Sequence, residues 1–222
     1  MYQIWHKNSL IIDFNGEVID KNKIPWGLRH YKNLNLSDIS IWINNRVNNL
    51  HRTYMNYLYI HKRIGRSTAG VIADSGGISI TDMYWIQIKE SSHTWDSLQI
   101  LRDEIWGYVT IGLDGKIDKT SSTSHPTSNF ALKGVHPKSI YKGYILKKGN
   151  FAEREYVGSK IAEILNIPSQ TVQKQDEDIF ALKVFTNDKL SLVHAYEYLF
   201  TPDRCVFKLH LDICKKFKNA IG

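Results

Sequence analysis

The chain has 222 residues, of which 42% are hydrophobic and 23% charged, and its formal net charge is +7. This composition is that of a folded globular protein with enough apolar residues for a core, and it excludes an intrinsically disordered chain. The positive charge favours an anionic partner such as nucleic acid, nucleotide phosphates or an acidic protein, although a charge of this size also serves plain solubility.

The two cysteines, Cys205 and Cys214, lie close together near the end of the sequence. Their spacing fits neither a disulfide framework nor a set of zinc ligands. The first seven residues lack the apolar core of a signal peptide, and no apolar stretch approaches the length of a membrane span. We therefore expect a cytoplasmic protein with reduced cysteines and no membrane partner.

Residues 1–118 predict a mixed α+β region. Strand-like residues on both sides of Asn15-Gly16 indicate a hairpin, because this dipeptide is a strong turn signal. Ser37 is a predicted N-cap for a helix whose apolar residues recur at helical spacing up to Val47. A second helix is expected from Ser67 to Ser75.

Glycine, threonine and serine residues mark the boundaries of the next elements. Gly76-Gly77 closes the predicted second helix, and residues 78–86 are β-branched and aromatic, which indicates extended structure. Thr94 is expected to cap a short helical turn that reaches Leu98. The segment 119–128 is rich in Ser and Thr and lacks large apolar residues, so it predicts a linker or an exposed loop.

A basic and aromatic stretch runs from Arg52 to Arg66. Tyrosines alternate there with Arg52, Lys62, Arg63 and Arg66. Such a stretch could contact a nucleic-acid backbone. The alternative, which we favour, is a solvated helix or loop face whose tyrosines pack inward. The nine histidines show no metal-ligand spacing.

Residues 129–200 predict a small antiparallel sheet with one flanking helix. Two strand candidates, 139–141 and 144–146, are joined by a Lys142-Gly143 turn, and residues 179–185 predict a buried strand. Asn150 followed by Glu153 resembles a capping box that opens a helix to about Asn166. The apolar residues of this helix fall on one stripe, namely Val157, Ile161, Ile164 and Leu165.

The loop from Ser128 to Lys138 contains small, polar and glycine residues between two strand-like segments. Such a loop can bring backbone N–H groups close to phosphate oxygens, because Gly134 has no Cβ to obstruct the approach. Lys133 and Lys138 add positive charge. The loop is neither a Walker A sequence nor the glycine-rich loop of protein kinases, and an ordinary surface hairpin is the alternative.

Lys147 ends an apolar strand, and Glu155 lies in the helix that follows. A strand lysine that contacts phosphates and pairs with a helix carboxylate is the arrangement of a kinase N-lobe. The alternative is that both side chains are simply solvated. Lys148 points to the opposite face of the strand, so the choice between the two lysines depends on register.

In their order and spacing, these segments resemble HipA-like kinases, in the divergent form found in Gram-positive bacteria and their mobile elements. The residues that carry the resemblance are 77–86, 94–95, 132–138, 144–149, 155–165 and 183–186. The resemblance implies that the loop with Lys133, Gly134 and Lys138 covers the phosphates of ATP. It also implies that Lys147 contacts ATP and that Glu155 is the ion-pair partner of Lys147.

The chain departs from the pattern of these kinases at the catalytic residues. The family places a catalytic Asp, in an Asn-x-Asp-Arg-His-x-x-Asn-like stretch, and a metal-binding Asp in a second lobe. Asp203-Arg204 lacks the following His and Asn. We therefore expect residues 201–222 to form a hinge or tail instead of a complete C-lobe, with no catalytic residue and no Mg²⁺ bound by this chain alone.

Three functions follow from these observations. The first is the nucleotide-binding half of a HipA-like serine/threonine kinase, truncated or acting with a separate C-lobe, with ATP as its cofactor and little activity by itself. The second is a non-enzymatic regulatory or antitoxin-like module that binds a protein partner. The third is a DNA-associated protein of a mobile element, which would contact DNA through residues 52–66.

Overall fold

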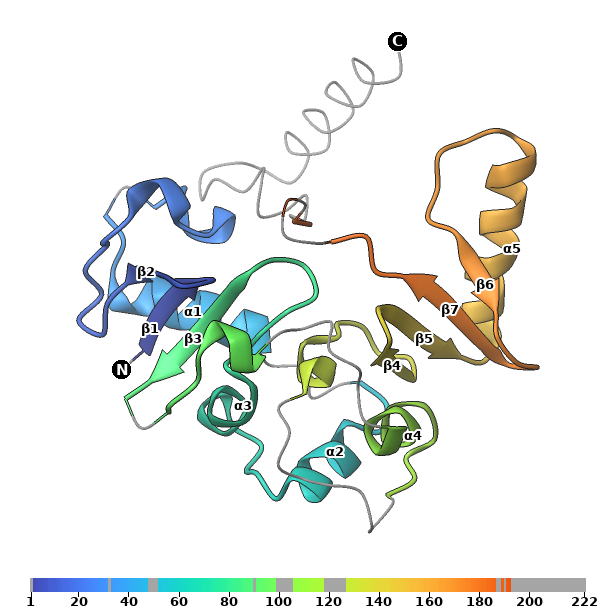
Figure 1. Cartoon of the computed structure of the whole chain (residues 1–222), viewed down its shortest axis with the longest axis horizontal. Coiled ribbons are helices and arrows are strands. Elements are labelled where there is room, and N and C mark those ends of the chain that lie inside the picture. The colour runs from blue at the N-terminus through green and yellow to red at the C-terminus, as the bar shows by residue number, and fades with distance from the viewer. Residues whose placement is uncertain are drawn as a thin grey trace.

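The computed structural model describes residues 2–31, 33–47, 52–89, 91–98, 106–117, 127–186, 189 and 191–192. In this part of the chain, five α-helices and two antiparallel sheets form the expected α+β fold (Figure 1). Predictions for the two cysteines, for Asp203-Arg204 and for most of the segment 119–128 lie outside the described residues.

The first sheet has the strand order β2-β1-β3. Its strands are β1 (Tyr2–His6), β2 (Ser9–Ile12) and β3 (Tyr84–Ile88). The predicted turn at Asn15-Gly16 returns the chain to an isolated bridge between Ile12 and Val18. Ile4 and Ile86 pair across the sheet and are fully buried, which places the main core of the protein on this face.

Three helices surround this core: α1 (Leu36–Val47), α2 (Met55–Lys62) and α3 (Thr68–Ser75). The predicted caps of α3 are confirmed, since Ser67 accepts a hydrogen bond from the backbone of Gly70 and Gly76 adopts a left-handed conformation. The prediction for α1 is wrong by two residues. Asn35 Oδ1 accepts hydrogen bonds from the N–H groups of residues 37 and 38, so Asn35 is the cap.

Short 3₁₀ helices occupy Lys21–Lys23, Trp26–Leu28, Trp95–Leu98 and Ser128–Ala131. The third is the turn expected after Thr94, whose side chain accepts a hydrogen bond from the N–H of Ser97. The fourth begins after Thr127. This residue was expected in an exposed segment, but it is buried and caps the turn by accepting a hydrogen bond from the N–H of Asn129.

The second sheet has the strand order β4-β5-β7-β6. Its strands are β4 (Lys138–Tyr141), β5 (Tyr144–Lys148), β6 (Val172–Lys174) and β7 (Ile179–Lys183). Lys142 and Gly143 both have positive φ angles, which suits the tight turn predicted between β4 and β5. β6 was not predicted, because only Val172 of its three residues is buried.

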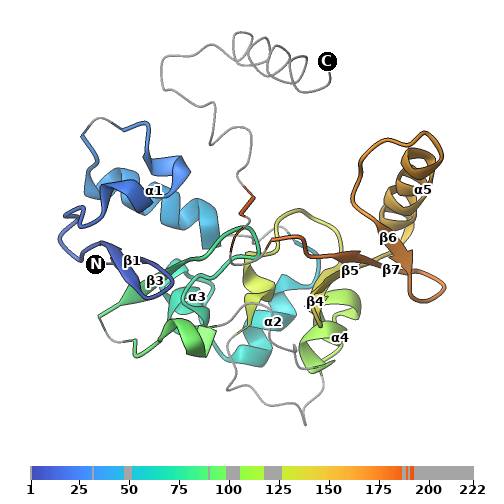
Figure 2. The same cartoon turned by 45° about the horizontal axis from the view of Figure 1, so that its top comes forward.

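Two helices cover opposite faces of the second sheet (Figures 1 and 2). α4 (Trp106–Asp114) packs on the face that carries Leu146 and Ala181. α5 (Asn150–Ile164) packs on the face that carries Phe180 and Leu182. α4 lies close to β4, since a Cβ at Gly112 would stand 2.6 Å from the carbonyl oxygen of Lys138.

The start and the packing of α5 differ from the sequence prediction. Gly149 occupies the N-cap position without a side-chain hydrogen bond, so Asn150 is the first helical residue and the predicted capping box is absent. The buried side chains of α5 are Ala152 and Ser159. The four apolar residues predicted as a packing stripe are instead exposed, namely Val157, Ile161, Ile164 and Leu165.

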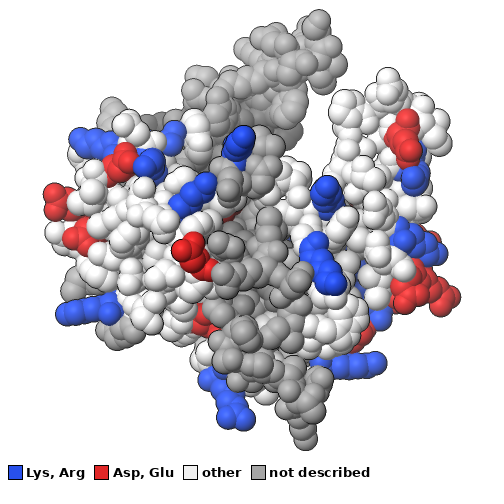
Figure 3. All heavy atoms as spheres, viewed as in Figure 1, with Lys and Arg blue, Asp and Glu red and all other residues white. Residues whose placement is uncertain are grey.

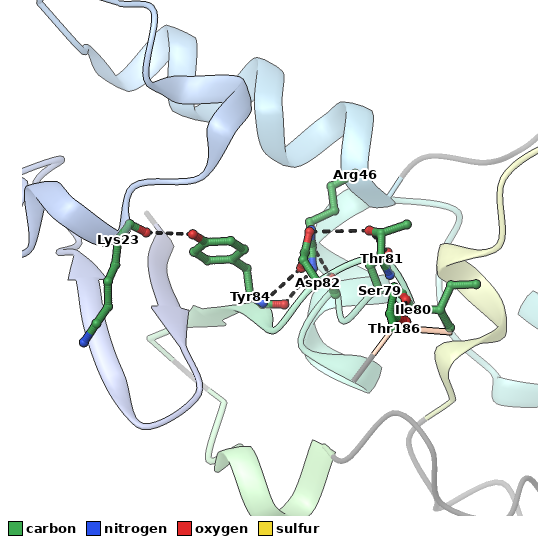
Figure 4. A network of polar contacts seen from close by, with 9 residues as sticks. Lys23, Arg46, Ser79, Ile80, Thr81, Asp82, Tyr84 and Thr186 are labelled. Carbon is green, nitrogen blue, oxygen red and sulfur yellow. Dashed lines mark hydrogen bonds and ion pairs between the residues drawn. The ribbon is translucent and has the colours of Figure 1, made fainter. Parts of the chain in front are cut away.

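A network of polar contacts centred on Arg46 joins α1 to the loop before β3 (Figure 4). The Arg46 guanidinium forms two hydrogen bonds with the Asp82 carboxylate, at 2.6 and 2.8 Å, and donates to the carbonyl oxygens of Gly77 and Tyr84. Thr186, just after β7, donates its hydroxyl to the carbonyl of Ile80 in the same loop. This hydrogen bond connects the chain that follows the second sheet to the loop before β3 of the first sheet.

Candidate functional site

Two lysines lie directly opposite each other on the second sheet. Lys138 in β4 and Lys147 in β5 are cross-strand partners, and the register places both side chains on the face covered by α5. Like charges at directly opposite positions of a sheet repel each other. This pair is therefore unfavourable unless an anion lies close to it.

Glu155 of α5 supplies one negative charge. The Lys147 ammonium lies 2.8 and 2.5 Å from the two carboxylate oxygens of Glu155, so the ion pair expected from the sequence is formed. The side chains are 19% and 45% exposed, respectively. Glu155 can reach the sheet because it lies one turn after Ala152, which packs against Phe180.

Lys138 is less exposed to solvent than Lys147. Its ammonium donates a hydrogen bond to the carbonyl oxygen of Lys133 at 2.6 Å, and the residue is buried. Burial is the main cause that lowers the pKa of Lys138 to about 8, and the positive charges of Lys147 and Arg52 add to the effect. Glu155 opposes the shift without cancelling it.

Gly134 makes room for this buried ammonium. Its φ angle is +93°, and a Cβ at this position would lie 2.8 Å from Lys138 Nζ. The sequence predicts an approach of phosphate oxygens at Gly134, and the group that lies closest to this position in the structure is the Lys138 side chain. A residue with a side chain at position 134 would strain the backbone and would also force the Lys138 ammonium to shift.

The loop before β4 forms hydrogen bonds with three residues from the first part of the fold, namely Asn45, Arg52 and Thr53. Arg52 donates to the carbonyl oxygens of residues 129 and 132, at 2.6 and 3.3 Å. Thr53 donates both its N–H and its hydroxyl to the carbonyl of residue 135. The Lys133 ammonium donates to the carbonyl of Asn45 near the end of α1.

The five residues predicted to bind a nucleotide therefore separate into two groups. The structure brings together Gly134, Lys138, Lys147 and Glu155. Lys133 contributes its backbone carbonyl to this cluster, while its ammonium group contacts α1. We refer to the four clustered residues as the dilysine site.

Arg52 is the participant that the sequence reasoning missed. The basic stretch around it predicts exposure to solvent, but Arg52 is buried, and burial lowers its pKa to about 10. Lys62 is also buried and forms an ion pair with Asp74 at 2.6 Å. The stretch from 52 to 66 is thus not one solvated surface, and of its Lys and Arg residues only Arg63 and Arg66 are exposed.

The loop also contacts the start of α5. The imidazole of His136 stacks on the Phe151 ring, with ring centroids 4.1 Å apart and planes 19° from parallel. The guanidinium of Arg154 lies over the same ring at 5.2 Å. These contacts connect the loop that carries Gly134 to the helix that carries Glu155.

The register also settles the role of Lys148. Its side chain lies on the face covered by α4, where its ammonium is 2.5 Å from an oxygen of Asp114 and 3.5 Å from Asp178. Lys148 is therefore engaged on the opposite side of the sheet, and Lys147 is the lysine that faces Glu155.

Charges of both signs are dispersed over the surface in Figure 3, without a single large basic patch among the described residues of that face. In the described part of the chain, no three His, Cys, Asp or Glu side chains gather as metal ligands would. No described helix is both long enough and apolar enough to cross a bilayer.

The comparisons with known proteins leave the site to be interpreted from its own geometry. The chain matches no protein-family model, no curated protein and no solved structure.

Proposed function

We propose that the dilysine site binds the phosphate groups of ATP, and that residues 129–200 act as the nucleotide-binding half of a HipA-like serine/threonine kinase. The observation that carries the proposal is the contact of Lys147 with both carboxylate oxygens of Glu155. This is the pairing that the resemblance implies, and it joins a strand to a helix as in a kinase N-lobe. Lys138, the cross-strand partner of Lys147, lies against the loop that carries Gly134.

The charge of the site supports an anionic ligand. Two lysines face each other, while Glu155 is the one described carboxylate that contacts either of them. A phosphate group has several strong acceptor oxygens, and hydrogen bonds between charged partners are stronger than neutral ones. Bound phosphate would offset the repulsion between Lys138 and Lys147, and Glu155 would keep Lys147 in position.

These residues bind the nucleotide, and other groups carry out the transfer of the phosphoryl group. Transfer of a phosphoryl group needs a residue that orients the acceptor hydroxyl, as well as a carboxylate that holds Mg²⁺. The resemblance places both in a second lobe. A separate C-lobe would therefore complete the enzyme, and the chain alone is expected to be inactive.

Calorimetric titration of the full chain with ATP, with and without Mg²⁺, tests the proposal. Lys147→Ala and Lys138→Met should each weaken ATP binding by about tenfold or more, because each removes a charge-assisted contact. Lys183→Ala is the matched control, since Lys183 is an exposed lysine at the end of β7. No detectable ATP binding, or equal weakening by the control, contradicts the proposal.

A second candidate function is a non-enzymatic regulatory or antitoxin-like module. The exposed apolar side of α5 favours it, because soluble proteins seldom leave such a surface open. A chain that binds no ATP but forms a complex through α5 would support this candidate. DNA binding is the weakest of the three, since Arg52 and Lys62 are buried in contacts within the protein.

A further inference from the structure

Arg52 is a buried cation without a carboxylate partner among the described residues. The residue is 3% exposed, and its Nε atom is buried with no hydrogen-bond acceptor. The pKa of the neighbouring Tyr59 is raised, so this hydroxyl supplies no negative charge near neutral pH. A buried charge without a counter-charge lowers stability. The retention of such a charge indicates a role beyond packing.

The Arg52 guanidinium contacts the turn at the start of the loop before β4. Its Nη1 donates to the carbonyl oxygens of Asn129 and Leu132, at 2.6 and 3.3 Å. The side-chain oxygen of Asn129 in turn accepts a hydrogen bond from the hydroxyl of Ser139 in β4, at 2.9 Å. Arg52, which precedes α2, therefore joins the first part of the fold to the backbone that leads into β4.

Thr53 holds the other end of the same loop. It donates its N–H and its hydroxyl to the carbonyl oxygen of Val135, at 2.9 and 2.7 Å. Between the two attachments lie Lys133, whose carbonyl oxygen accepts a hydrogen bond from the Lys138 ammonium, and Gly134, which leaves room for that ammonium. The place of the ammonium thus depends on a loop that the first part of the fold holds at both ends.

The charge of Arg52 also acts on Lys138. Burial is the main cause that lowers the pKa of Lys138, the positive charges of Lys147 and Arg52 follow, and Glu155 opposes them. The described charged groups that act on Lys138 are therefore two cations and one carboxylate. Lys147 and Glu155 belong to the second sheet and its helix, whereas Arg52 brings a charge from the first part of the fold.

We propose that Arg52 is a positioning residue of the dilysine site, which keeps the Lys138 ammonium beside Lys147 by holding the loop at residues 129 and 132. Arg52 acts through this loop and through its charge, and not by contact with the ligand. Part of the region 1–118 thereby belongs to the site. The effect on Lys138 is present without a nucleotide, and only its consequence for ATP binding rests on the proposed function.

An NMR titration of Lys138 in the full chain tests the positioning role without a nucleotide. The lysines are labelled with ¹³C, and the Lys138 signal is assigned by its absence from Lys138→Met. In Arg52→Gln the pKa of Lys138 should rise from about 8 toward its ordinary value of 10.5, because a positive charge is lost and the loop releases the ammonium to solvent. Arg52→Lys keeps the charge and should shift the pKa less, although it lacks the rigid fork of donors.

The matched control is Arg46→Gln, which changes a second buried arginine whose contacts lie around the loop before β3. This variant should be destabilised but should leave the pKa of Lys138 at its wild-type value. A Lys138 that titrates in Arg52→Gln as it does in the wild type overturns the proposal. An equal shift in Arg46→Gln also overturns it, because the shift would then follow from a general loss of stability.

A measurement on the wild type covers the case in which Arg52→Gln does not fold. The Nε and Cζ signals of Arg52, observed by carbon detection and assigned with Arg52→Lys, should follow the titration of Lys138 near pH 8. The signals of the exposed Arg63 should not follow it. Arg52 signals that stay constant between about pH 7 and 9.5 show that the two groups are not coupled, and they overturn the proposal.

Calorimetric titration with ATP at pH 7 measures the consequence for the proposed function. Arg52→Gln should weaken ATP binding roughly tenfold, Arg52→Lys should weaken it less, and Arg46→Gln should leave the affinity unchanged. A wild type that binds no ATP contradicts the proposed function alone, since the titration of Lys138 requires no nucleotide. An affinity that Arg52→Gln retains in full overturns the positioning role.

Discussion

Lys138 and Lys147 stand opposite each other across β4 and β5, and Glu155 contacts only Lys147. The two ammonium groups differ in what surrounds them. Lys147 has a carboxylate partner, whereas Lys138 is held by a backbone carbonyl and has a lowered pKa.

Replacing Glu155 with Gln should destabilise the protein by about 0.5–1 kcal/mol at low ionic strength, because the repulsion between the two lysines is then unopposed. The loss should shrink in high salt or on addition of inorganic phosphate. Thermal unfolding under these conditions measures it. Glu163→Gln, which affects the exposed pair with Lys160, is the control and should have a smaller effect. An unchanged melting temperature for Glu155→Gln at low salt contradicts the prediction.

Lys138 should make stability depend on pH between about 8 and 10.5. Its pKa is lower in the folded protein than its ordinary value of 10.5, so the unfolded chain binds more protons in this window and stability rises with pH. Below pH 8 the buried charge opposes folding by up to about 3 kcal/mol. Lys138→Met removes this term and should be more stable than the wild type at pH 7.

Urea unfolding of both proteins from pH 7 to 10.5 tests this dependence. The stability advantage of Lys138→Met should fall steadily as the pH rises, since the wild type loses its buried charge. Groups that titrate in both proteins cancel in the difference between them. A difference that stays constant over the whole range shows that Lys138 keeps its ordinary pKa in the folded state.

Gly134→Ala should destabilise the protein by about 1–3 kcal/mol, for two reasons that can be separated. The positive φ angle is unfavourable for alanine, and the new Cβ would meet the Lys138 ammonium. In a Lys138→Ala background only the first cost remains. Urea unfolding of the two single variants and the double variant should therefore show a cost for Gly134→Ala that is smaller in the second background. Equal costs would show that the ammonium does not occupy this space.

Arg46→Ala should cost about 3–5 kcal/mol, because it leaves the Asp82 carboxylate without its partner in a largely buried setting. It also removes donors to the carbonyls of Gly77 and Tyr84. Arg63→Ala, on an exposed arginine, is the control and should change the free energy of unfolding by less than about 0.5 kcal/mol. A similar loss of unfolding free energy in the two variants, measured by urea unfolding, would contradict a special contribution of the Arg46 network.

Local signals in the sequence predict most elements of the fold. Ser67 and Gly76 bound α3 as expected, and Lys142-Gly143 forms the turn between β4 and β5. The pairing of Lys147 with Glu155, which the resemblance implies, is also formed, between a strand and the next helix along the chain. These features depend on residues that are near each other in sequence.

The remaining differences come from contacts that local patterns do not encode. The apolar residues of α5 do lie on one side of the helix, as the sequence predicts. The small residues Ala152 and Ser159 face the sheet, however, and the apolar residues Val157, Ile161, Ile164 and Leu165 are exposed to solvent. Arg52 looks like a surface residue until the fold brings Asn129 and Leu132 to it across more than seventy residues of sequence. β6 has one buried residue in three, which is too short a pattern to recognise.

Successive lysines on β5 bind helices on the two sides of one sheet. Lys147 reaches α5 through Glu155, and Lys148 reaches α4 through Asp114. A slip of this strand by a single position would exchange the two side chains and break both attachments at once. β5 therefore holds both helices on the sheet. A one-residue insertion in the hairpin before β5 should break the ion pairs to α4 and α5 together.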